Sequence, residues 1–107
     1  MARRKYFTET RVAGFKYHEG LLCYDELRVG AELTMVREAD NSYDHNAVAF
    51  YRGDCKIGYI PRGENEQFAT FFDLNPSDLF EARINKVDED AHSENRIGVT
   101  IFLKERE

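Results

Sequence analysis

The chain has 107 residues, enough for one domain with one core. Hydrophobic residues make up 42% and charged residues 33%, with two prolines, so a folded protein is favoured over a disordered one. The net charge of −5 argues against a protein that binds nucleic acid by general attraction to phosphate. Any nucleic-acid site in this chain must therefore be small and shaped.

The basic residues 1–5 are followed by Tyr-Phe-Thr-Glu-Thr and not by the apolar segment of a secretory signal. The sequence has no apolar run near the ~20 residues that a membrane-spanning helix needs. We therefore expect a cytoplasmic protein. Cys23 and Cys55 both lie in segments that lean apolar, which suits buried thiols as well as a disulfide, and in a reducing cytosol we expect thiols.

Hydrophobic periodicity and turn residues predict the elements in chain order. Strand-like alternation covers 6–15 and 31–37, and a Gly-Asp turn separates the apolar run 47–51 from one that closes on Pro61. One or two helical turns are expected at 20–27, and a helix is expected to begin at Pro61 and end before Asn75-Pro76. The last two strands are expected at 79–87 and 97–103.

This order of elements has no βαβ alternation and no internal repeat. It predicts a mainly β fold with two helices, a small OB-like or SH3-like barrel of about six strands, because closing a sheet removes its exposed edges. We expect a flexible N-terminus at 1–5, a single domain over 6–103 and a tail at 104–107.

The polar loop 40–46 contains an aromatic residue, Tyr43, next to Asp44. Its start resembles a calcium loop, but His45 stands at the sixth position, where glycine is needed, and Tyr51 at the twelfth, where glutamate is needed. The sequence also shows no zinc-ligand spacing, no nucleophile motif and no phosphate-binding glycine loop. We predict no metal, no cofactor and no catalytic residue, and therefore a protein that is not an enzyme.

A site for single-stranded nucleic acid needs aromatic faces, which contribute roughly 1 to 3 kcal/mol per base, and a few arginines or lysines nearby. Four places offer such residues: 16–18, 37–44, Arg52 and 56–62. Taken singly, each is better explained by ordinary surface or half-buried residues, and the loop Asn and Asp residues by turn formation. Together they indicate a shared rim.

Three motifs in this order resemble the HIRAN domain. They are Gly-Phe-Lys-Tyr at 14–17, Leu-Thr-Met-Val-Arg-Glu at 33–38 running into Asp-Asn-Ser-Tyr-Asp-His-Asn-Ala-Val at 40–48, and Ile-Gly-Tyr-Ile-Pro-Arg at 57–62. The resemblance extends from about Tyr6 to Leu103. HIRAN domains occur fused to Swi/Snf-type ATPases that remodel stalled replication forks, and also alone in bacteria, and this chain resembles the standalone kind.

The resemblance implies an OB-like barrel that captures the 3′-terminal end of single-stranded DNA. It implies that Asp44 accepts a hydrogen bond from the terminal 3′-hydroxyl, that Tyr43 stacks on a terminal base and that Asn41 supports the loop. A carboxylate repels phosphate, so Asp44 would select a free hydroxyl over a 3′-phosphate. The other expected DNA contacts are Lys16, Tyr17, Tyr59, Arg62 and His92.

The sequence departs from the DNA-binding members at three places. His18 stands where they have a second aromatic residue, Ser42 replaces a common proline, and the loop 91–93 offers only His92 where an aromatic residue can help with stacking. The leading hypothesis is a binding module for single-stranded DNA with a free 3′-hydroxyl, acting in DNA repair or replication-fork processing beside a helicase, ATPase or other repair protein. The alternative is a protein-interaction domain that keeps the fold and in which the loop 40–46 is structural.

Overall fold

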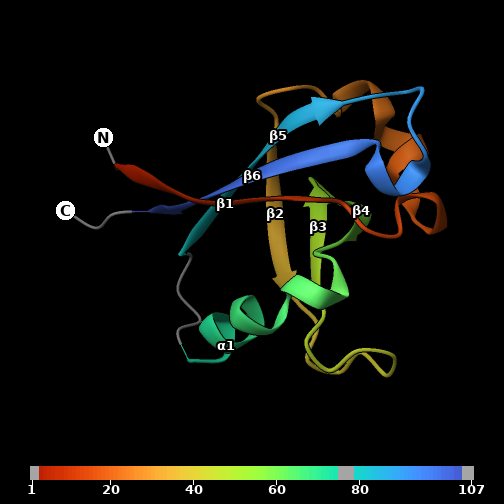
Figure 1. Cartoon of the computed structure of the whole chain (residues 1–107). Helices are drawn as coiled ribbons and strands as arrows, with labels where there is room; N and C mark the ends of the chain where they lie inside the picture. The colour runs from red at the N-terminus through yellow and green to blue at the C-terminus, as the bar shows by residue number, and fades with distance from the viewer. Residues whose placement is uncertain (1–2, 75–78, 105–107) are drawn as a thin grey trace.

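The structure, a computed structural model, describes residues 3–74 and 79–104, and this part of the chain is built around one six-stranded antiparallel sheet (Figure 1). The sheet order is β1-β6-β5-β2-β3-β4. The predicted mainly β fold is confirmed. The strands are β1 (Arg4–Arg11), β2 (Glu32–Arg37), β3 (Val48–Arg52), β4 (Cys55–Tyr59), β5 (Phe80–Val87) and β6 (Ile97–Lys104).

The sheet closes on itself just beyond the end of β1. Ala13 and Tyr59 form an antiparallel bridge in which the Ala13 N–H donates to the Tyr59 carbonyl at 2.8 Å and the Tyr59 N–H donates back at 2.9 Å. The approach requires glycine at position 58, because a Cβ there would lie 2.4 Å from Val12 Cγ1 and φ is +154°. The bridge joins the two outer strands and gives the barrel-like shape.

Both predicted helical regions are helical in the structure, but their start points differ from the prediction and shorter 3₁₀ turns accompany them. The expected turns at 20–27 form the 3₁₀ segment η2 (Glu19–Glu26), which follows a shorter one, η1 (Phe15–Tyr17). The helix expected to begin at Pro61 begins later, as α1 (Glu66–Leu74), after a 3₁₀ turn, η3 (Arg62–Glu64). Pro61 has an extended ψ of 139°, so it leads into the turn and is not the first residue of the helix.

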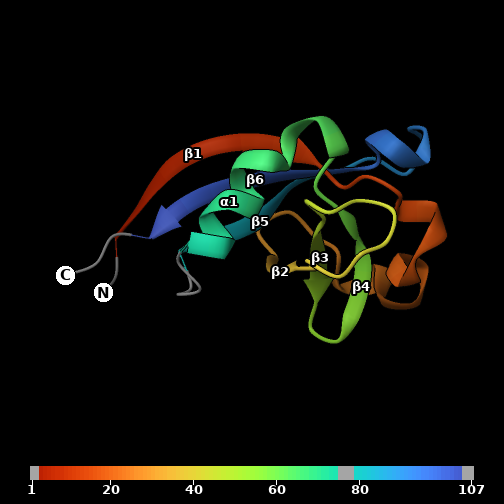
Figure 2. The ribbon, with the colours of Figure 1, turned by 90° about the horizontal axis from the view of Figure 1, so that it is seen from below.

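The helix α1 anchors its apolar side on β1 and β5 (Figure 2). Phe68 is buried, and its ring lies 5.7 Å from that of Phe7 and 5.2 Å from that of Phe80, measured between centroids. Phe72 packs on Phe80 as well. Because this aromatic cluster fixes α1, the residues just before it, 61–65, are held against the loop 40–46.

The two cysteines correct one expectation. Cys23 and Cys55 form a disulfide, whereas the sequence interpretation favoured free thiols. The packing of η2 along β4 brings their Cα atoms to 6.6 Å, within the range that disulfides span. The expected redox compartment therefore did not predict the state of these cysteines.

Strand ends also differ from the prediction. β1 starts at Arg4 and ends at Arg11, while the sequence placed this strand over 6–15, because the chain turns at Gly14 with φ of +73°. β6 extends to Lys104, where the tail was expected. Residues 1–2, 75–78 and 105–107, which include parts of the predicted termini and the Asn75-Pro76 stop, lie outside the described residues. No helix in 3–74 or 79–104 is long and apolar enough to span a membrane.

Candidate nucleic-acid interface

An open groove of about 1230 Å³ lies where the loop 40–46, the end of β4 and the residues after β1 meet. This volume exceeds the roughly 300 to 1,000 Å³ of typical small-molecule sites, which suits a short segment of a polymer. Among the described residues, six of the eight predicted site residues line the groove: Tyr17, Asn41, Tyr43, Asp44, Tyr59 and Arg62.

The aromatic residues of the groove fall into an exposed pair and a packed pair. Tyr43 is 87% exposed and Tyr17 is 73% exposed, so both rings have faces open for stacking. Tyr59 is half-buried and meets the ring of His18 edge-on, at 5.2 Å between centroids. Burial, together with the positive charge of Lys56, lowers the pKa of His18, which favours its neutral ring.

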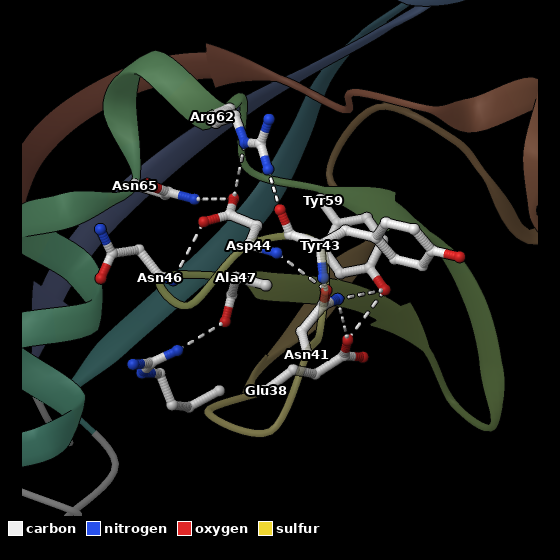
Figure 3. A network of polar contacts seen from close by, with 10 residues as sticks. Glu38, Asn41, Tyr43, Asp44, Asn46, Ala47, Tyr59, Arg62 and Asn65 are labelled. Carbon is white, nitrogen blue, oxygen red and sulfur yellow. Dashed lines mark hydrogen bonds and ion pairs between the residues drawn. The ribbon is translucent and has the colours of Figure 1, made fainter.

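Asn41 sets the shape of the loop (Figure 3). Its side-chain oxygen accepts the backbone N–H groups of Tyr43 at 2.8 Å and Asp44 at 3.1 Å. Its amide group donates to Glu38 at 3.1 Å. This Asx-type turn fixes the backbone from which the Tyr43 ring projects.

A polar cluster beneath the loop ties it to the hairpin. The Tyr59 hydroxyl donates to Glu38 Oε1 at 2.8 Å, and Lys56 Nζ pairs with Glu38 Oε2 at 2.6 Å. Burial by itself raises the pKa of Glu38, but hydrogen bonds from Lys56, Tyr59 and Asn41 outweigh it and leave that pKa below its ordinary value. Burial and the bond to Glu38 raise the pKa of Tyr59.

Asp44 faces both the groove and the start of α1 (Figure 3). Its Oδ1 accepts the backbone N–H of Asn46 at 3.0 Å, and its Oδ2 accepts the side-chain amide of Asn65 at 2.7 Å. Arg62 Nε lies 3.6 Å from Oδ2, too far for a hydrogen bond. A carboxylate offers about four lone-pair positions, so Asp44 keeps capacity for a ligand donor.

The predicted cations and His92 occupy different places. Arg62 lines the groove, its side chain is 71% exposed, and it donates to the Tyr43 carbonyl. Lys16 stands beside the groove, its Nζ 5.0 Å from the centroid of the Tyr17 ring. His92 precedes the 3₁₀ turn η4 (Ser93–Asn95) and accepts the Glu94 N–H at 3.2 Å. Neither Lys16 nor His92 is among the described residues that line the groove.

A model of the HIRAN domain matches residues 5–106 of this chain. The chain belongs to the HIRAN domain family. HIRAN domains are nucleic-acid-binding modules and not catalytic ones. The resemblance noted in the sequence motifs is therefore confirmed.

Two solved structures share the fold. One is a protein from Lactobacillus plantarum, with a TM-score of 0.83 and 23% identity, covering 99% of this chain and 100% of that one. The HIRAN domain of human HLTF is also similar, with a TM-score of 0.72 and 15% identity, covering 97% of this chain and 81% of that one. None of the curated proteins matches the chain.

Three residues of this HIRAN domain that contact the predicted site were not among the predicted site residues. His18 lines the groove, Glu38 bonds to Asn41 and Tyr59, and Asn65 bonds to Asp44. His18 carried a signal, since it continues the basic-aromatic run at 16–18. Asn65 carried none, because a polar residue ahead of an apolar helical stripe indicates a helix start and nothing more.

Proposed function

We propose that this HIRAN domain binds single-stranded DNA at a free 3′-hydroxyl end, in DNA repair or replication-fork processing. One arrangement carries the proposal: the loop 41–44 presents an exposed ring, Tyr43, and a carboxylate, Asp44, beside the exposed cation of Arg62 on one groove wall. The ring suits a base, the cation suits a phosphate, and the carboxylate suits a hydroxyl donor.

The position of Asp44 supports a hydroxyl over a second phosphate. A carboxylate in the groove repels a terminal phosphate, while the hydroxyl of an unmodified end donates to it. Arg62 Nε lies 3.6 Å from Asp44 Oδ2, and from there the guanidinium can neutralise the phosphate that links the last two nucleotides. The protein is acidic overall, so this local pair, and not the net charge, provides the attraction.

The test is fluorescence anisotropy with a short labelled oligonucleotide that ends in a 3′-hydroxyl and the same oligonucleotide with a 3′-phosphate. We expect tighter binding of the hydroxyl end, loss of this preference in Asp44→Ala, and weaker binding of both ends in Arg62→Ala by about tenfold, or roughly 1.4 kcal/mol. Lys86→Ala is the matched control, because Lys86 is exposed on β5 and is not among the described groove residues. Equal binding of both ends by the unmodified protein would sink end recognition.

A protein-interaction domain is the second candidate, and one observation favours it. Asn41 and Asp44 both bond to the backbone of their own loop, which explains these residues without any ligand. A partner, such as a helicase, ATPase or other repair protein, would then bind elsewhere on the surface. A pull-down that retrieves the same partner with Tyr43→Ala and Asp44→Ala as with the unmodified chain supports this candidate, and loss of that partner with either variant rejects it.

A further inference from the structure

Asn65 is the one buried polar or charged residue within 3–74 and 79–104, with 2% of its surface exposed. Removing an amide from water costs about 1 to 3 kcal/mol when its hydrogen bonds are not replaced. Buried polar groups are almost always hydrogen-bonded, so the partner of the Asn65 amide indicates what this residue does.

The Asn65 amide donates to Asp44 Oδ2 at 2.7 Å, across 21 positions of sequence (Figure 3). The amide nitrogen, and not its oxygen, must face the carboxylate, because two acceptors at this distance repel each other. The backbone carbonyl of Asn65 accepts the Ala69 N–H at 2.9 Å, so the same residue also stands at the start of α1. The buried residues Phe68 and Ala69 fix that helix on the core.

This bond leaves Asp44 with a defined free side. Within residues 3–74 and 79–104, Oδ2 accepts the Asn65 amide and Oδ1 accepts the backbone N–H of Asn46, so lone pairs remain for a ligand donor. Arg62 is exposed and beyond hydrogen-bonding distance of Asp44, so it can turn toward a ligand phosphate while Asn65 still holds the carboxylate. The orientation of Asp44 therefore depends on Asn65 more than on Arg62.

We propose that Asn65 is a positioning residue for DNA-end recognition: it holds the Asp44 carboxylate so that a remaining lone pair faces the terminal hydroxyl, and it thereby sets the preference for hydroxyl over phosphate ends. The inference rests on the proposed function of Asp44. It adds a residue from the start of α1 that does not line the groove and touches no ligand.

Two variants separate positioning from folding. Asn65→Ser keeps a residue that suits a helix start, but its hydroxyl is too short to reach Asp44. Asn65→Asp keeps the size of the side chain and replaces the donor by an acceptor, which repels the Asp44 carboxylate. Gln67→Ala is the matched control, since Gln67 is exposed on the first turn of α1.

The readout is the ratio of the affinities for the 3′-hydroxyl and 3′-phosphate oligonucleotides, measured by anisotropy with the full chain. A loss of stability lowers the folded fraction and therefore weakens the binding of both oligonucleotides by the same factor. The ratio of the two affinities then stays unchanged. Displacement of the carboxylate changes the ratio itself. We expect the hydroxyl preference to fall at least about tenfold in Asn65→Ser and Asn65→Asp, a loss of roughly 1.4 kcal/mol, and to persist in Gln67→Ala.

The outcomes distinguish the two proposals. A hydroxyl preference in the unmodified protein that persists in both Asn65 variants overturns the role of Asn65 and leaves the proposed function standing. If the Asn65 variants bind both oligonucleotides more weakly by the same factor, so that the affinity ratio is unchanged, the positioning role is also overturned and Asn65 acts in folding alone. Absence of any preference in the unmodified protein rejects the proposed function, and the inference falls with it.

Discussion

At the scale of single residues, the Tyr59 hydroxyl is the link between the hairpin and the loop. It donates to Glu38 at 2.8 Å, while Glu38 also accepts from Asn41. Replacing Tyr59 by Phe keeps the ring and leaves Glu38 with one donor fewer, so we expect a loss of about 1 kcal/mol in the free energy of unfolding. Urea denaturation followed by circular dichroism measures it.

Tyr17→Phe is the control for this change, because Tyr17 is 73% exposed and its ring lies open in the same groove. We expect a change within about 0.5 kcal/mol for it. A loss for Tyr17→Phe equal to that for Tyr59→Phe would contradict the role assigned to the bond between Tyr59 and Glu38.

Glu38 makes the folded protein less stable at acidic pH. Its pKa in the folded protein lies below the ordinary 4.5 because the bonds from Lys56, Tyr59 and Asn41 outweigh its burial. The unfolded chain therefore binds this proton more readily than the folded one. The stabilisation from Glu38 is full above pH 4.5 and is lost as the pH falls through the lower, folded value.

We expect Glu38→Gln to flatten the loss of melting temperature between neutral pH and about pH 3 relative to the unmodified protein. Glu81 offers a comparison, because hydrogen bonds from Arg83 and Arg4 outweigh its burial and also lower its pKa. Glu81→Gln should therefore also reduce the fall of the melting temperature at acidic pH. A melting temperature that falls as steeply toward acidic pH in Glu38→Gln as in the unmodified protein contradicts this role of Glu38.

At the scale of elements, the disulfide joins η2 to β4 and closes a loop between positions 32 apart in sequence. In the chain-entropy account, a loop of this length contributes about 3 to 4 kcal/mol to stability. We expect the Cys23→Ser/Cys55→Ser variant to lose about that much in urea, and a thiol reductant to have the same effect on the unmodified protein. No response to the reductant would contradict the bridge.

Strand positions could be predicted where a strand buries one face, because residues such as Leu33 in β2 and Ile84 in β5 reveal that face by alternation. The ends of elements could not be predicted as well. Pro61 suits the first turn of a helix, but the bond between Ile60 and Val48 keeps the chain extended there. Local propensity does not contain that long-range contact.

The same limit applies to the site. Asn41, Tyr43 and Asp44 are neighbours in sequence, so a motif could reveal them together. Asn65 lies 21 positions from Asp44 in sequence, and Lys56 lies 18 positions from Glu38. Only the fold brings each pair into contact. Groups that meet through tertiary packing leave no local pattern, which is why the network beneath the loop was not predicted.

At the scale of the whole molecule, the net charge of −5 limits how DNA can be held. If Lys16 and Arg62 supply the phosphate contacts, the slope of log K against log salt is about −1.4, from roughly −0.7 for each contact to a single strand. We expect Arg62→Ala to reduce the slope to about −0.7 in anisotropy titrations at several salt concentrations. A slope several times steeper would indicate a broad basic surface and contradict the small site.

The central claim is that the domain binds an end of DNA and not the strand as such. Competition against a labelled linear oligonucleotide with a 3′-hydroxyl tests it most directly, using the unlabelled linear oligonucleotide and the same sequence closed into a circle. The circle offers every base and phosphate but no terminus. We predict that the linear competitor displaces the probe and that the circle needs at least about tenfold more, a difference of roughly 1.4 kcal/mol. Equal displacement by the two would contradict end capture through Tyr43 and Asp44.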